Sequence, residues 1–257
     1  MIGAFDSGIG GLTVVKAIWQ VLPNIPLVYF GDTARTPYGN KSAEVISQFG
    51  LEIADFLIKQ GATILVVACN TVSAVGIQAI KERFPRVPVF EVITPAVAKV
   101  REVSKSKRVG IIGTRALVNS NIYQSLLVGF KVFQQAAPLL VPLVEEDWLV
   151  KPETKRIIKG YLQPLKQQQI DTLVLACTHY PLLKKLIVAR AGKRATVIDP
   201  AEETALQLKH YLETSQKDSS LLGEGDSHFF VSDLTPHFQK IAELWLKRKI
   251  TLERVTI

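Results

Sequence analysis

The sequence predicts an α/β protein with two similar domains, each a mainly parallel sheet flanked by helices and related by a pseudo-twofold axis. Short apolar runs alternate with helical patterns along the whole chain, as in βαβ units. Two of these runs, Leu65–Cys69 and Leu173–Cys177, are nearly alike and hold both cysteines of the protein. Each half also places a hydroxyl residue, Ser7 or Thr114, at a similar distance before its cysteine, 62 residues in the first half and 63 in the second.

The first half begins with a strand and continues with alternating helices and strands. Short apolar runs bounded by turn residues are typical of buried strands, and longer amphipathic stretches are typical of helices. We expect strands at Ile2–Phe5, Leu27–Phe30, Ile64–Ala68 and Val87–Val92, and helices at Gly11–Val21 and Ala43–Gln60.

The second half repeats this alternation. We expect strands at Arg108–Ile112, Leu139–Leu143, Leu173–Ala176 and Ala195–Ile198, and helices near Leu117–Gly129 and Pro152–Gln168. A polar, Gly- and Ser-rich segment, Gln216–Gly225, predicts a loop. After it we expect a short strand at Phe229–Val231, a helix near Pro236–Lys247 and a last strand.

The domains are expected to interleave in the sequence. We expect residues 1–94 plus 206–257 to form the first domain, which carries Cys69, and residues 95–205 to form the second, which carries Cys177. Prolines at positions 95 and 200 mark the expected crossings between the two. Clefts between domains are favoured ligand sites, so the active site is expected there.

Composition narrows the class of protein. The 257 residues have a mean hydropathy of +0.20, and no apolar stretch approaches the ~18 residues of a membrane span. The chain begins directly with a strand pattern, so we expect no signal peptide and a cytoplasmic location. Two cysteines are too few for a disulfide framework. The sequence also contains no C-x-x-C motif of the kind that binds zinc. The net charge of +8 is spread over several segments without a nucleic-acid-binding motif, so we expect solvated helix faces and no nucleic-acid partner.

The two cysteines are the strongest chemical signal. The carboxyl ends of parallel strands face the ligand crevice in open α/β sheets, so Cys69 and Cys177 are expected to reach the same place. A reaction that needs one acid and one base on opposite sides of a substrate would use such a pair. Three alternatives remain: two buried apolar side chains, a disulfide, or a metal site with His179. Thiols inside cells stay reduced, which disfavours the disulfide. Acidic residues that could act as ligands are not clustered with the two cysteines and His179, which disfavours the metal site.

Polar residues around the cysteines are candidate partners. Asp6 and Ser7 open a glycine-rich turn before the first helix, where free N–H groups attract anions; one of the two could instead be a plain N-cap. The turn matches no nucleotide-binding pattern. The long polar loop Gly31–Ser42 follows the second expected strand, and loops at strand ends often carry function.

The residues after each cysteine could bind an amino-acid carboxylate. Asn70-Thr71 follows Cys69, and Thr178-His179 follows Cys177. A nearby protonated histidine lowers a cysteine pKa, although His179 could equally be structural. Glu145 comes soon after the expected strand Leu139–Leu143 and is the nearest candidate carboxylate, with Glu146 and Asp147 as neighbouring alternatives.

At this point the chain resembles the glutamate racemases of the bacterial cell-wall pathway. The matching segments are Gly3–Val14, Tyr29–Gly39, Ala68–Thr71, Val141–Glu145, Ala176–Leu183 and Asp199–Ala205. The resemblance implies inversion of L-glutamate to D-glutamate at Cα without a cofactor or metal, by two thiol bases that match Cys69 and Cys177. It implies assisting roles for Asp6, His179 and Glu145. The positions that match the family's substrate contacts are Ser7, Tyr38, Gly39, Asn70, Thr71, Thr114 and Thr178.

The resemblance also sets expectations about partners. Glutamate is the expected small-molecule substrate, the product supplies peptidoglycan synthesis, and the chain is expected to form a homodimer. An aspartate racemase of the same superfamily would differ mainly in pocket length. A non-catalytic binding role through the basic surface is the other alternative.

Overall fold

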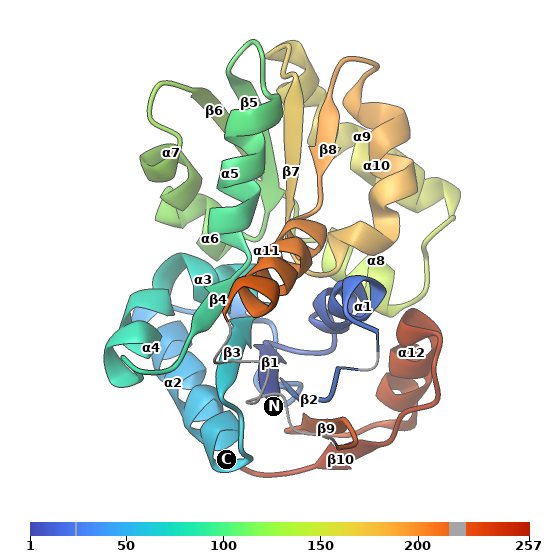
Figure 1. The fold of residues 1–257 in the computed structure, drawn as a ribbon. Coiled ribbons are helices and arrows are strands. Elements are labelled where there is room, and N and C mark those ends of the chain that lie inside the picture. The colour runs from blue at the N-terminus through green and yellow to red at the C-terminus, as the bar shows by residue number, and fades with distance from the viewer. Residues whose placement is uncertain (24, 216–224) are drawn as a thin grey trace.

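The computed structural model describes residues 1–23, 25–215 and 225–257, and it contains two parallel sheets flanked by helices (Figure 1). The predicted α/β class is therefore confirmed. A six-stranded sheet has the order β10-β9-β2-β1-β3-β4, and a four-stranded sheet has the order β6-β5-β7-β8. All pairings in both sheets are parallel.

The larger sheet brings the ends of β1 and β3 side by side. β1 pairs with β2 and β3, so that Phe5 lies opposite Phe30 and Val67. The first three strands are fully buried, which fits their continuous apolar composition. The strands are β1 (Ile2–Asp6), β2 (Leu27–Gly31), β3 (Ile64–Val67), β4 (Val89–Glu91), β9 (His228–Val231) and β10 (Leu252–Arg254).

The smaller sheet has the same kind of centre. β5 lies between β6 and β7, and Gly113 at its end pairs with Ala136 and Ala176. Its strands are β5 (Arg108–Gly113), β6 (Lys131–Ala136), β7 (Thr172–Ala176) and β8 (Thr196–Ile198). Cys69 follows β3 and Cys177 follows β7, so each cysteine lies just beyond the carboxyl end of a buried strand, as the sequence predicted.

The helices connect these strands and cover the sheets. They are α1 (Leu12–Val21), α2 (Ala43–Lys59), α3 (Asn70–Val75), α4 (Ile77–Arg83), α5 (Ile93–Val103), α6 (Arg115–Ser120), α7 (Ile122–Leu126), α8 (Leu140–Glu145), α9 (Pro152–Gln167), α10 (Lys184–Ala191), α11 (Pro200–Thr214) and α12 (Pro236–Leu246). Local sequence signals explain where several helices begin. Ser42 and Thr114 accept hydrogen bonds as N-caps of α2 and α6, and Asp199 caps α11 just before Pro200. α11 packs between α1 and α5, near the middle of the molecule (Figure 1).

One predicted strand is wrong. Leu139–Leu143 is not a strand, because Leu140–Glu145 forms α8. The neighbour of β5 is instead β6, whose sequence Lys-Val-Phe-Gln-Gln-Ala is too polar to stand out. An edge strand needs only one apolar face, and a short apolar run does not distinguish helix from strand. Pro142 also lacks the N–H that a strand ladder requires.

Two further expectations need comment. The helix expected at Leu117–Gly129 is divided into α6 and α7 at Asn121, whose φ of 54° lies in the left-handed region. The loop expected at Gln216–Gly225 lies, except for its last residue, outside the described residues.

The domain boundaries stay a prediction, although β9 and β10 do join the sheet of β1–β4. In the described part of the chain, no helix combines the length and apolar character that crossing a bilayer requires.

Candidate active site

Asp6 and Cys69 lie together at the ends of β1 and β3. Both are buried, with exposed fractions of 1% and 4%. Cys69 takes the N-cap position of α3, with extended backbone, and contacts Asp6 and Ser7. An Asp6 carboxylate oxygen accepts a hydrogen bond from the Gly11 N–H at 2.9 Å. The turn before α1 therefore fixes the carboxylate beside the first thiol.

Cys177, His179 and Glu145 form a chain of contacts beyond β7. The Cys177 sulfur lies 4.0 Å from Nδ1 of His179, and Nε2 of His179 lies 3.0 Å from Oε1 of Glu145. Cys177 and His179 are buried, and Glu145 is partly exposed. The wrong secondary structure at Leu139–Leu143 does not remove Glu145 from the site, because the C-terminal end of α8 carries it to the imidazole.

The two sides differ in electrostatics. Burial, followed by the charge of Asp6, raises the Cys69 pKa to about 12, and burial also raises the Asp6 pKa. Burial alone would lower the His179 pKa. The hydrogen bonds to Cys177 and Glu145 outweigh that effect and raise the His179 pKa to about 10. At neutral pH the first side therefore holds a thiol, whereas the second holds an imidazolium.

The two sheets meet through hydroxyl groups at the site. Thr13, in the first turn of α1, donates to the Thr178 carbonyl at 2.8 Å. Thr178 donates weakly to Asp6, at 3.4–3.5 Å, and the hydroxyls of Thr71 and Thr114 lie 3.0 Å apart. Glycine permits a close approach here: a Cβ on Gly10 would lie 2.4 Å from the His179 ring. The relative placement of the two cysteines thus depends on these contacts.

The cysteines line one small cavity of about 40 Å³. The cavity is lined by Ser7, Thr36, Pro37, Tyr38, Gly39, Cys69, Asn70, Thr71, Thr114, Val141, Cys177, Thr178 and His179. All seven predicted substrate-contacting residues are among them. Asp6 and Glu145 do not line the cavity and lie behind Cys69 and His179. Such a volume holds about one water molecule, which makes this a closed form of the site.

A second hollow of about 390 Å³ adjoins the cavity. It is lined by Arg115, Asn40, Pro138, Leu139, Pro142, Glu145 and Tyr180, and it shares Thr36, Pro37, Gly39, Thr114 and Val141 with the cavity. These shared residues form the wall between the cysteines and the larger space. The hollow is therefore the larger space that adjoins the site.

Two side chains of the cavity have informative hydrogen-bonding states. Oδ1 of Asn70 is buried and has no hydrogen-bond partner within the described residues. A buried acceptor without a partner is costly, and a bound ligand can supply the donor. The Tyr38 hydroxyl, in contrast, already donates to the buried carboxylate of Asp32. Tyr38 therefore offers the cavity its ring edge and backbone more readily than its hydroxyl.

The sequence did not indicate several residues that position the site. Thr13 joins α1 to the turn after Cys177, the Trp245 ring lies edge-on to His179 at 5.7 Å, and His237 contacts the Glu145 carbonyl oxygen at 2.9 Å. Trp245 and His237 belong to α12, which is distant in sequence. No local motif signals these contacts, because each of the three residues also fits an ordinary surface or core role.

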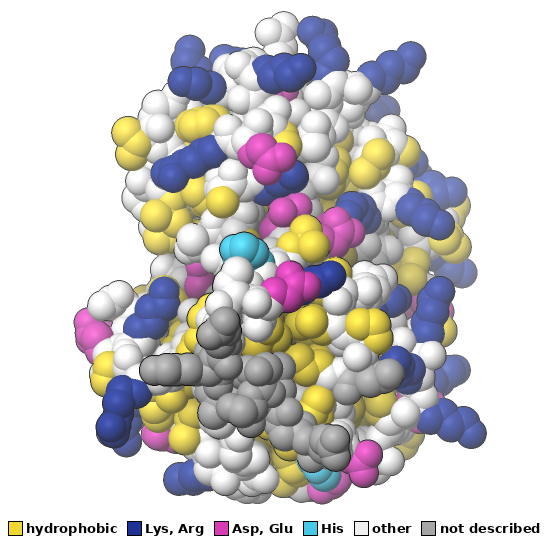
Figure 2. Space-filling model, in the orientation of Figure 1, with side chains coloured by type: hydrophobic (Ala, Val, Ile, Leu, Met, Phe, Trp, Pro, Cys, Tyr) yellow, Lys and Arg dark blue, Asp and Glu magenta, His cyan; other side chains and the backbone are white. Residues whose placement is uncertain are grey.

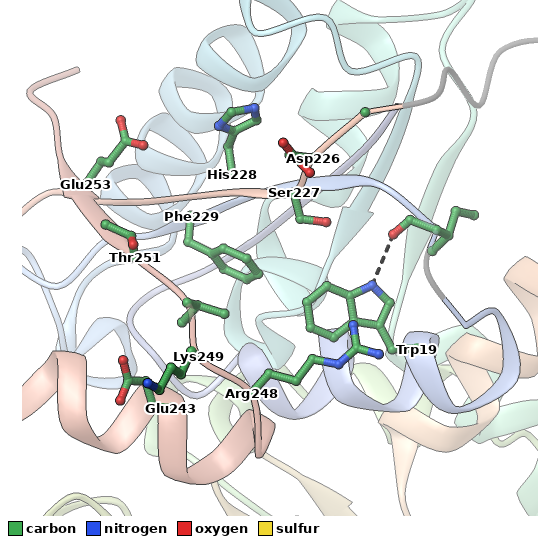
Figure 3. A pocket seen from close by; sticks show the side chains of 13 residues that line it. Trp19, Asp226, Ser227, His228, Phe229, Glu243, Arg248, Lys249, Thr251 and Glu253 are labelled. Atoms are coloured by element: carbon green, nitrogen blue, oxygen red, sulfur yellow. Dashed lines mark hydrogen bonds between the residues drawn. The ribbon is translucent and has the colours of Figure 1, made fainter.

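Other concave regions do not contain the cysteines. A hollow of about 700 Å³ lies between α1, α12 and the strands β9 and β10, where Arg248 stands 4.6 Å above the Trp19 ring (Figure 3). None of the predicted site residues lines it. Within the described ranges, no three His, Cys, Asp or Glu side chains gather in a way that could hold a metal ion.

Comparisons with known proteins agree with this geometry. Residues 12–208 match the family model for Asp/Glu/hydantoin racemases. A glutamate racemase of Syntrophus aciditrophicus is 41% identical over 100% of this chain and 96% of its own length. Two crystal structures are also similar. A glutamate racemase isoform from Bacillus anthracis has a TM-score of 0.92 and 36% identity, covering 100% of this chain and 97% of that one. The glutamate racemase of Francisella tularensis in complex with D-glutamate has a TM-score of 0.90 and 35% identity, covering 99% and 97%. The chain therefore belongs to the Asp/Glu/hydantoin racemase family and, within that family, to the glutamate racemases.

Proposed function

We propose that this enzyme racemises glutamate by moving protons between Cα and the thiols of Cys69 and Cys177. The observation that carries the proposal is that both free, buried cysteines follow strands of different sheets and line one cavity. Two groups on opposite sides of a carbon can remove a proton from one face and deliver a proton to the other.

The two cysteines take opposite roles in the proposed proton transfer. The high pKa of Cys69 keeps it a thiol, ready to give a proton. The protonated His179 stands beside Cys177. For the enantiomer whose Cα–H faces Cys177, Cys177 takes the α-proton and the Cys69 thiol protonates the opposite face. For the other enantiomer the roles are exchanged: Cys69 takes the α-proton, and Cys177 protonates the opposite face.

The remaining residues suit an amino-acid dicarboxylate. Hydroxyl groups of Ser7, Thr71, Thr114 and Thr178 donate to carboxylate oxygens, and the unpaired Oδ1 of Asn70 accepts from the substrate ammonium group. The Francisella tularensis relative, which binds D-glutamate, supports glutamate as the ligand. The closed cavity must widen to admit it, and the adjoining hollow gives the direction of entry.

The proposed reaction forms D-glutamate from L-glutamate. We infer that the D-glutamate formed is used in peptidoglycan synthesis. The homodimer stays a prediction, which sedimentation equilibrium of the purified chain would check.

The decisive experiment replaces each thiol by the hydroxyl group of serine, a much weaker acid that is hardly ionised near neutral pH. Cys69→Ser and Cys177→Ser should each lower racemisation of L- and D-glutamate by about 10³-fold or more in polarimetry without added cofactor, because proton transfer at Cα then lacks one partner. Ser73→Ala is the control, since this hydroxyl contacts the Val67 carbonyl and does not line the cavity. A Cys177→Ser enzyme that racemises at the rate of the wild type would refute the proposal.

A further inference from the structure

The net charge of this protein is confined to one part of the sequence. Residues 95–205 contain 17 Lys and Arg against 9 Asp and Glu. All other residues together contain 14 of each kind. The whole excess of +8 therefore belongs to the segment that builds the four-stranded sheet.

Many of these cations gather at the end of that sheet opposite the cysteines. Seven of them lie in or beside the loops that lead into its strands, and we call this surface the basic pole: Lys105, Lys107, Arg108, Lys131, Lys166, Lys193 and Arg194. All are exposed except Arg108, which is half-buried. Figure 2 shows Lys and Arg side chains crowded at this upper end of the molecule, above β5, β7 and β8.

The cations of the basic pole lack acidic partners. Within the described residues none of the seven forms an ion pair, whereas Lys99 and Lys184 elsewhere in the same segment pair with glutamates at 2.7 and 2.6 Å. Asp171 is the acid at this pole, but Ser104 and Ser106 already donate to its carboxylate at 2.6 and 2.5 Å. Burial alone would raise the Asp171 pKa, yet these hydrogen bonds outweigh it and lower the pKa. Asp171 stays ionised and offsets one of the seven positive charges, so most of the mutual repulsion among these cations is not compensated inside the molecule.

The basic pole also contains a hollow. This hollow, of about 530 Å³, is within the size range of small-ligand sites. Its charged lining consists of four cations, Arg108, Lys166, Lys193 and Arg194, and one carboxylate, that of Asp171; Ile170, Ala191 and Ala195 form its apolar sides. Arg108 is held in place, because its Nε donates to the Gln168 carbonyl at 2.6 Å and its guanidinium lies 5.1 Å from the Phe133 ring centre. Both of its Nη groups have no hydrogen-bond partner among the described residues. A fixed guanidinium with free N–H groups is well suited to bind phosphate oxygens.

We propose that the hollow of the basic pole binds a small anion with two or more phosphate groups. Nucleic acid is disfavoured because the nearby aromatic rings, Phe130 and Phe133, are covered by Lys107 and Arg108 and offer no stacking platform for bases. A membrane surface is disfavoured because Val128 is the one strongly exposed large apolar residue beside these loops in the described structure. The site is separate from the cysteines and does not depend on the proposed reaction.

Tripolyphosphate is a suitable probe for calorimetry with the full chain at physiological ionic strength. The wild type should bind it with one-to-one stoichiometry, and affinity should fall as salt is added. Lys166→Gln/Lys193→Gln should weaken binding about tenfold or more, because two charge-assisted contacts are lost. Lys81→Gln/Lys240→Gln removes the same charge from exposed positions on α4 and α12, and it should change affinity less than about twofold. Racemase activity should stay unchanged in both variants.

Three results would overturn the proposal. One is no measurable binding of tripolyphosphate by the wild type. Another is equal weakening by the two double variants, which would show a response to net charge alone. The third is tighter, length-dependent binding of a short DNA duplex that the pole variant abolishes, which would identify an extended polyanion surface.

Discussion

Gly10→Ala tests whether the close approach of α1 to the second thiol positions the catalytic groups. Gly10 precedes α1 and faces the turn that contains Thr178 and His179. The added Cβ would lie 2.4 Å from Cε1 of His179 and 2.4 Å from Oγ1 of Thr178. An ordinary contact begins near 3.4 Å, so the two segments must separate by about 1 Å.

The surroundings of His179 do not allow an easy shift. Its ring is held between Glu145 at 3.0 Å and Trp245, and Thr13 ties α1 to the Thr178 carbonyl. Overpacking of this kind costs about 1–3 kcal/mol of folding free energy. A displacement of about 1 Å at a reacting group can lower the rate about 10²-fold. We therefore expect kcat/KM for glutamate to fall about 10²-fold while the protein remains folded.

The assay is polarimetry of both glutamate enantiomers, with thermal unfolding measured on the same samples. Gly8→Ala is the matched control in the same turn, because its Cβ would meet Thr36 at 3.5 Å, an ordinary contact. The control should keep activity within a few-fold of the wild type. If Gly10→Ala keeps the kcat/KM of the wild type, the contact between α1 and His179 does not position the site.

Three other predictions concern the same site. His179→Asn should change the primary deuterium isotope effect mainly in the direction in which Cys177 abstracts the proton, and Asp6→Asn mainly in the other; equal changes in both directions would show a shared network. The raised His179 pKa means that its protonated form stabilises the fold, fully below pH 6.5 and progressively less as pH rises through about 10. The melting-temperature difference between wild type and His179→Asn should therefore shrink over that range, and a difference independent of pH would contradict the assignment. Turnover of L-aspartate should be lower than that of glutamate by up to about 10⁴-fold, because a shorter substrate leaves buried donors unpaired, and comparable turnover would favour an aspartate racemase.

The sequence by itself determined the fold class and the position of both cysteines. Leu65–Cys69 and Leu173–Cys177 are continuous apolar runs within a chain of alternating strand and helix patterns, where such runs are typical of buried parallel strands. The small polar residues that follow each cysteine could only lie at the carboxyl ends of those strands. These local patterns required no knowledge of distant contacts. By contrast, the edge strand β6 was missed, since a strand with one exposed face carries a weak apolar signal.

Only the tertiary structure decided how the site is assembled and charged. The approach of Glu145 to His179, the contact of Thr13 with Thr178 and the edge-on packing of Trp245 join elements that are far apart in the sequence. The pKa values of Cys69 and His179 follow from burial and from these neighbours, which no local pattern specifies. Packing of one element against another is cooperative and depends on the whole chain, so residue type and spacing predict which groups are available but not the distances between them.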